Sequence, residues 1–190
     1  VASLVGSEMC IRDSDNTVLR FHANKGFSIR QWHRAVELLR ENSLRVKTYL
    51  LFKPPFMSEG DALEHTSRWV REVSKISDEV SINPMNIQKG TIVDRLFRNR
   101  EYRPPWLWSL VEMIFRTHAD ISNTDCRVIV HPTAGGKTRG SHNCGSCDSE
   151  VVAAIERYSV SGDLREFTGL ECDCKNCLLY TSDAADERNS

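Results

Sequence analysis

The feature that most constrains the fold of this chain is a regular alternation of helix-like and strand-like segments. Apolar residues recur three or four positions apart, the spacing of one helix face, in the segments 29–39, 62–76, 92–97 and 108–115. Strands that are separated by helices pair in parallel, because each helix carries the chain back across the sheet before the next strand begins. The sequence therefore predicts an α/β fold with parallel strands near 46–52, 79–83 and 127–131.

The small number of predicted strands limits what this domain can be. Three strands neither close a barrel nor make a parallel sheet that is covered on both faces. The length of 190 residues and the net charge of −1 fit one soluble domain or a piece of one, and no apolar run approaches the roughly 18 residues of a membrane span. The near-zero charge also argues against a histone-like binder of nucleic acid. We therefore expect a fragment of a larger α/β domain.

The two ends of the chain are set apart from this fold. Residues 1–14 and 177–190 both resemble translated sequencing-adapter sequence, which carries no information about a fold. A signal peptide is the alternative for the first segment, but it has no basic region and only a very short apolar stretch. We expect artefactual tails at 1–14 and 177–190 that pack on nothing, a main domain over 15–139 and a cysteine-rich metal-binding extension over 140–176.

Two cysteine pairs in the last third of the chain give the strongest chemical signal. Two residues separate Cys144 from Cys147, and one residue separates Cys172 from Cys174. A predicted helix of about ten residues follows the first pair. Two close pairs joined through a compact element supply the four thiolates of a closed tetrahedral metal site. Zinc is the first expectation in a reducing cytosol, and an auxiliary iron–sulfur cluster is the second.

Two alternatives stay open for this cysteine group. The cysteines could be buried or free thiols, and His131 or His142 could replace one sulfur as a ligand. Cys126 begins an apolar strand and is predicted to be a core residue, whereas Cys177 lies in the adapter-like tail and is not counted.

Polar residues follow the predicted strands where the carboxyl ends of a parallel sheet would meet. Ligands of α/β barrels bind at these strand ends. A glycine-rich loop after the third strand would bring further polar residues to the same place. The predicted cofactor- or substrate-binding residues are Lys53, Asn83, Asn86, Gln88, Lys89, His131 and Arg139. The alternative is that the lysines are solvated and that the asparagines form turns.

The segment 131–138 departs by one residue from a phosphate-binding loop of nucleoside triphosphatases. Its first glycine position is His131, and the residues that follow, 139–145, cannot begin the helix whose N-terminus would face the phosphate. The sequence therefore argues against a nucleotide triphosphatase.

Several motifs in a fixed order carry a resemblance to a known family. They lie at 24–27, 46–56, 81–91 and 101–109. Over almost all of 15–176 the chain resembles the second half of the radical S-adenosylmethionine (SAM) subunit of archaeosine synthase, an archaeal family similar to the elongator-type radical SAM domain. The resemblance implies a partial TIM-like barrel. It also implies an enzyme of tRNA modification that forms archaeosine by cleaving the lysine C–N bond of a 7-deazaguanine–lysine adduct.

The same resemblance implies cofactors and partners. The full-length protein would hold a 4Fe-4S cluster and S-adenosylmethionine, act on tRNA with the lysine-transferase subunit of archaeosine synthase, and work in the cytoplasm without a membrane. The Cys-x3-Cys-x2-Cys motif that holds the cluster is absent from this sequence, so the resemblance places it upstream of residue 15. We therefore expect this chain alone to be inactive, and its catalytic residues are unknown.

A local run of arginines and a second function class complete the predictions. Four arginines lie close in sequence to aromatic residues and could bind the tRNA backbone: Arg95, Arg98, Arg100 and Arg103. A charged helix face is the simpler interpretation of this run. The alternative function is a zinc-binding interaction module without catalysis.

Overall fold

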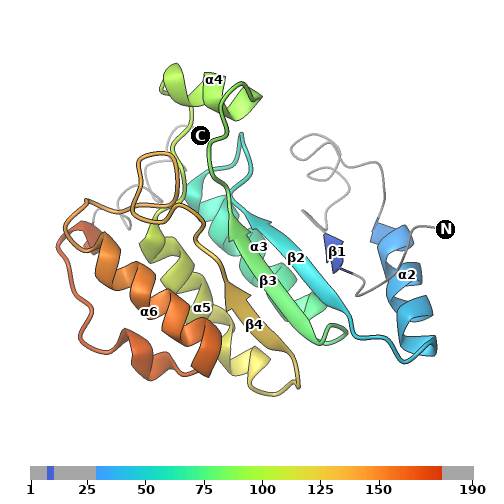
Figure 1. The fold of residues 1–190 in the computed structure, drawn as a ribbon. Coiled ribbons are helices and arrows are strands. Elements are labelled where there is room, and N and C mark those ends of the chain that lie inside the picture. Colours follow the sequence, from blue (N-terminus) through green and yellow to red (C-terminus); the bar gives the residue numbers. More distant parts are fainter. Residues whose placement is uncertain (1–7, 11–28, 177–190) are drawn as a thin grey trace, which may run out of the picture.

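The computed structural model describes residues 8–10 and 29–176, in which a single parallel sheet is flanked by helices (Figure 1). The strands are β1 (Glu8–Cys10), β2 (Lys47–Phe52), β3 (Glu79–Pro84) and β4 (Arg127–Val130). They lie side by side in chain order, and every neighbouring pair is parallel. The three predicted strands and their parallel pairing are therefore confirmed. The described strands form an open sheet, and the partial TIM-like barrel stays a prediction.

The helices follow the strands as the alternation predicts. They are α2 (Ile29–Glu41), α3 (Glu59–Val73), α4 (Ile92–Arg98), α5 (Leu107–Ile121), α6 (Asp148–Ser161) and a 3-10 helix, η1 (Leu164–Phe167). The hydroxyl of Ser58 accepts a hydrogen bond from the Asp61 N–H and begins α3, and Gly162 ends α6 at a φ of +69°. None of the described helices is both long and apolar enough to cross a membrane.

The sheet has one face that packs into the core and one that is less covered. Leu50 and Phe52 of β2 are buried, whereas Tyr49 and Leu51, which alternate with them, are half-buried. The buried set belongs to one continuous core with apolar residues of α3, α5 and α6. Figure 1 shows α3 behind the sheet. The period of two along β2 therefore separates a core side from a less buried side, whereas β3 and β4 are buried over three consecutive residues.

α6 lies beside β4 (Figure 1) and completes the hydrogen bonding of that strand. The hydroxyl of Ser159 accepts a hydrogen bond from the Val130 N–H at 2.9 Å, and the Ser159 carbonyl accepts one from the Arg127 guanidinium at 2.8 Å. Among the strands that the structure describes, β4 is the last of the sheet, so the Val130 N–H has no further strand there as partner. Ser159 therefore supplies hydrogen bonds that a neighbouring strand would otherwise make with β4.

The N-terminal segment differs from the expectation that both ends pack on nothing. Within 1–14, the three residues of β1 pair in register with the first half of β2, from Glu8 opposite Lys47 to Cys10 opposite Tyr49. The physical reason is that the outer side of β2 offers unpaired N–H and C=O groups, which accept any extended segment within reach. The rest of 1–14 and all of 177–190 lie outside the described residues, so the adapter interpretation stays a prediction.

We expect Ser159→Ala to lower the free energy of unfolding by about 1–3 kcal/mol, because it leaves the buried Val130 N–H without an acceptor. Urea denaturation measures this loss. Ser161→Ala is the matched control on the same helix: that hydroxyl is exposed, water can replace it, and the change should stay within about 0.5 kcal/mol. Equal effects of the two substitutions would contradict the assignment.

Candidate functional site

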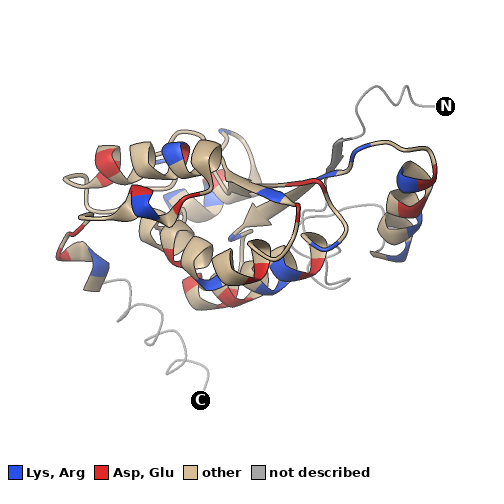
Figure 2. Ribbon diagram, turned by 90° about the horizontal axis from the view of Figure 1, so that it is seen from below, with Lys and Arg blue, Asp and Glu red and all other residues tan. Residues whose placement is uncertain are grey.

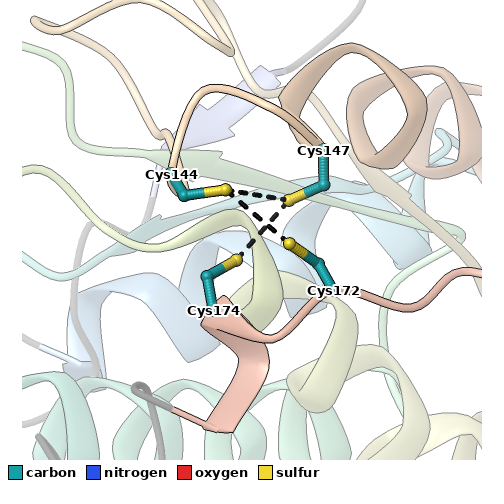
Figure 3. A group of neighbouring side chains, drawn as sticks. All are labelled: Cys144, Cys147, Cys172 and Cys174. Atoms are coloured by element: carbon teal, nitrogen blue, oxygen red, sulfur yellow. Dashed lines mark hydrogen bonds between the residues drawn. The ribbon is translucent and has the colours of Figure 1, made fainter.

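The four predicted cysteines converge on one point. Cys144 and Cys147 lie in the loop before α6, and Cys172 and Cys174 follow η1 (Figure 3). The Sγ–Sγ distances are 4.0 Å for Cys144–Cys147, 3.7 Å for Cys144–Cys172 and 3.6 Å for Cys147–Cys174, and all four sulfurs lie within 4.8 Å of one another. Gly145, at a φ of +94°, lets the first pair turn back on itself.

The sulfur spacing fits a single tetrahedral metal ion. A Zn–S bond of about 2.3 Å gives a tetrahedron whose sulfurs are roughly 3.8 Å apart, close to the three distances between these thiols. An iron–sulfur cluster bonds its thiolates to different iron atoms and therefore spreads them farther apart. Among the described residues the ligand group contains these four cysteines and neither His131 nor His142.

Hydrogen-bond donors surround the two buried sulfurs. The indole Nε1 of Trp108 donates to Cys174 Sγ at 3.3 Å, and the Asn143 amide donates to Cys147 Sγ at 3.4 Å. The Asp148 carboxylate accepts the backbone N–H groups of Asn143 and Gly145 and so fixes the loop that carries the first cysteine pair. Donors of this kind orient the ligands of a metal and reduce the charge on their sulfurs.

Thiol pKa values differ across the group. Hydrogen bonds from the backbone of Cys147 and Ser146 lower the pKa of the exposed Cys144 to about 6, whereas burial raises the pKa of Cys147 and of Cys174. Four thiolates in one place repel one another, and a divalent cation removes that repulsion. Cys126, the predicted core residue, is buried outside the group, and burial raises its pKa to about 12.

The carboxyl edge of the sheet, where β2, β3 and β4 end, contains a buried ion pair. Lys53 Nζ lies 2.6 Å from Glu59 Oε2, and each residue is only 8% exposed. The second oxygen of Glu59 accepts the Trp106 N–H at 2.9 Å, and the Tyr102 hydroxyl donates to the Lys53 carbonyl at 2.8 Å. Lys53 is therefore not a solvated loop lysine. Its ammonium group already has a partner within the fold.

The other predicted ligand residues have varied surroundings. The Asn83 amide donates to the Ser81 carbonyl, and the Gln88 amide donates to the Asn86 side chain, as expected of turn residues. Lys89 and His131 are exposed. Their role as ligand-binding residues stays a prediction.

Arg139 connects the loop after β4 to α4. Its guanidinium donates to Asp94 Oδ1 at 2.5 Å and to the Ile87 carbonyl at 3.1 Å. The Arg139 hydrogen bond is the largest cause that holds the pKa of Asp94 at about 2, with a further contribution from the Gly90 N–H. Asp94 was not among the predicted residues, although its position three residues after the helix cap Thr91 is a recognisable capping pattern.

The predicted arginine run is divided by the fold. Arg95, Arg98 and Arg100 are exposed, but Arg103 turns inward, where its guanidinium donates to the His142 carbonyl at 2.9 Å and stacks 3.8 Å from the centre of the Trp106 ring. Burial lowers the pKa of Arg103. Arg103 therefore supports the loop before the cysteines and does not extend the charged surface.

Known proteins resemble most of this chain. Archaeosine synthase subunit beta of Methanosarcina acetivorans is 34% identical over 165 residues, which cover 87% of this chain and 47% of that protein. The protein of the same name from Thermococcus kodakarensis is 35% identical over 171 residues, 90% of this chain and 52% of that protein. An uncharacterized protein of Methanocaldococcus jannaschii is 30% identical over 168 residues, 86% of this chain and 45% of that protein.

The chain spans about half the length of these curated relatives. It matches no protein-family model. A solved structure of Methanocaldococcus infernus Elp3 with an N-terminal deletion has a TM-score of 0.62 at 20% identity, and the match covers 90% of this chain and 38% of that chain. At this identity the likeness concerns the fold alone.

We expect Lys53→Met to lower the free energy of unfolding by about 3–5 kcal/mol, because it leaves the buried Glu59 carboxylate without its cation. The double variant Lys53→Met/Glu59→Gln should regain most of this loss, since a neutral amide needs no counter-charge and can still accept the Trp106 N–H. Urea denaturation compares the two. A double variant as unstable as the single one would show that Lys53 acts through its packing and not through its charge.

Proposed function

We propose that this chain is the second half of a radical SAM protein of the archaeosine synthase β-subunit type, which acts in tRNA modification. The observation that carries the proposal is the identity of 34–35% to two proteins of that name along almost all of the chain. The parallel sheet and its Elp3-like fold agree with a partial TIM-like barrel. The resemblance of the motifs at 46–56, 81–91 and 101–109 supports the same assignment.

In this proposal the whole protein cleaves the lysine C–N bond of a 7-deazaguanine–lysine adduct in tRNA, in the cytoplasm and together with the lysine-transferase subunit. A 4Fe-4S cluster and S-adenosylmethionine would supply the radical chemistry, and the cluster ligands belong to a part of the protein that precedes residue 15. This chain would contribute the carboxyl edge of three strands. Asn83, Gln88, Lys89 and His131 are the candidates for ligand contact there, while the Lys53–Glu59 pair holds the first loop in place.

We further propose that Cys144, Cys147, Cys172 and Cys174 bind one zinc ion. The sulfur distances of 3.6–4.0 Å support a mononuclear site over an auxiliary iron–sulfur cluster. The four ligands leave no open coordination position, which is typical of a structural zinc. In this role the metal joins the end of η1 to the loop before α6.

We expect the purified chain to contain one zinc ion, and Cys174→Ser to contain less than about a tenth of that amount, because three thiolates do not close the site. Metal analysis by mass spectrometry measures both. Cys126→Ser is the matched control, since it removes a buried thiol outside the group and should leave the zinc content unchanged. Iron with visible charge-transfer absorption would keep the ligands but contradict zinc, and full metal content in Cys174→Ser would contradict the ligand set.

We expect residues 15–176 to replace the matching half of the Thermococcus kodakarensis protein in a strain that lacks the latter. The chimera should restore archaeosine, which mass spectrometry of digested tRNA detects, whereas the same chimera with Cys174→Ser should not. A chimera that is soluble and carries its zinc but yields no archaeosine would contradict the proposed function. That result would favour the alternative, a zinc-binding interaction module without catalysis, for which the closed four-cysteine site alone is the supporting observation.

A further inference from the structure

Residues 85–103, here called the α4 protrusion, form a small unit of their own beyond the carboxyl edge of the sheet. Figure 1 shows α4 standing away from the other helices. The unit has its own apolar cluster, separate from the main core, made of Ile87, Val93 and Tyr102 with Met85, Leu96 and Phe97 around them. A segment of this length is not needed to connect β3 to α5. Long connecting segments of this kind are commonly functional.

The α4 protrusion is held firmly by one acidic residue. Asp94, 3% exposed, accepts hydrogen bonds from Arg139 at 2.5 Å, Arg98 at 2.8 Å and the Gly90 N–H at 3.0 Å. A backbone hydrogen bond from the Ile87 N–H to the Arg139 carbonyl fixes the same loop a second time. The negative charge of Asp94 is therefore compensated by residues of the fold. These contacts also fix the α4 protrusion in position relative to the strand ends.

The outward charge of the α4 protrusion is positive. Its exposed cations are Lys89, Arg95, Arg98 and Arg100, and its only exposed acid among these described residues is Glu101. The whole chain has a net charge of −1, so this excess of cations is local. Figure 2, seen from below, shows acidic and basic positions interspersed along the helices on that side. The protrusion thus carries a concentrated basic surface on an otherwise balanced molecule.

A hollow of about 440 Å³ opens on this basic surface. Thr91, Arg95, Arg98 and Asn99 line it together with Gly90, the exposed side chain of Ile92 and the buried Asp94. The Asp94 carboxylate is already bonded to Arg98 and Arg139, so its charge is compensated within the fold. Guanidinium groups match phosphate oxygens with paired N–H donors, and an amide such as that of Asn99 can hydrogen-bond to a ribose or a base edge. The Thr91 hydroxyl is already used, since it donates to the Gln88 carbonyl and accepts the Asp94 N–H. Arg95 and Arg98 are three residues apart on α4, so their side chains lie next to each other.

We propose that the α4 protrusion binds the phosphate backbone of an RNA strand, with one nucleotide in the hollow between Arg95 and Arg98. This inference rests on the proposed function, since it names the surface that would hold the tRNA beside the strand ends. An acidic protein is disfavoured as the partner because the surface has a single exposed large apolar residue, Ile92, whereas protein interfaces need an apolar centre.

The test measures binding of an unmodified tRNA transcript to the full chain by fluorescence anisotropy, from about 50 to about 200 mM salt. The variant Lys89→Gln/Arg95→Gln/Arg100→Gln removes three exposed charges and leaves the Asp94 contacts intact. We expect it to bind roughly tenfold more weakly or worse, and the slope of log affinity against log salt to fall by about 2–3. The control Arg34→Gln/Lys75→Gln/Arg116→Gln removes the same charge from exposed positions of α2, the segment after α3 and α5, and should change binding less than about twofold.

The outcomes separate this surface from the proposed function. Equal binding by the two triple variants would overturn the assignment of the surface and leave the archaeosine chimera test untouched. A poly-glutamate peptide that binds as tightly as the tRNA, with the same loss in the first variant, would replace RNA by an acidic protein. A wild-type chain that does not bind the transcript at the lowest salt would contradict the RNA surface even if the chimera makes archaeosine. Unchanged urea midpoints show that both variants fold.

Discussion

The buried carboxylate of Glu59 joins the parts of the molecule that the rest of the structure depends on. One of its oxygens holds Lys53 at the end of β2, and the other accepts the Trp106 N–H just before α5. Loss of this partner would leave the buried Lys53 ammonium without a counter-charge, at a cost of several kcal/mol, and would leave the Trp106 N–H without its acceptor. The carboxylate therefore fixes the start of α5 relative to the end of β2, and both β4 and α6 contact that helix.

The cysteine site uses this same helix entry. Asn143 accepts the Trp108 N–H with its side-chain oxygen and donates to Cys147 Sγ with its nitrogen, so a single amide joins α5 to one cysteine of the group. The Trp108 indole reaches Cys174 from the other side. α6 also shares the main core through residues such as Ile155 and Tyr158. The cysteine loops are thus anchored by packing, and the proposed metal would bind four sulfurs that the framework has already brought together.

The sequence predicted well the features that depend on neighbouring residues in the chain. It predicted poorly the contacts between residues that are far apart in the sequence. Strand positions followed from apolar runs, and the two close cysteine pairs followed from their spacing, because both depend on neighbours in the chain. The structure brings the two pairs together. The sequence showed Lys53 as a polar residue at the end of a strand but did not show that it belongs to an ion pair. A lysine that binds a ligand would occur at the same place in the sequence. The Arg139–Asp94 pair spans 45 residues. Only the register of the sheet and the path of two loops bring its partners together.

The cysteine site and the α4 protrusion are held by one continuous framework. Arg103, the last residue of the protrusion, bonds to the carbonyl of His142 in the loop before the cysteines, and Arg139 in the same stretch of chain bonds to Asp94 at the base of α4. A metal that stiffens the cysteine loops would therefore also limit the movement of the protrusion. If the chain acts as proposed, zinc at the four cysteines would have a structural purpose: it would keep the proposed RNA-binding surface of the α4 protrusion at a constant distance from the strand ends.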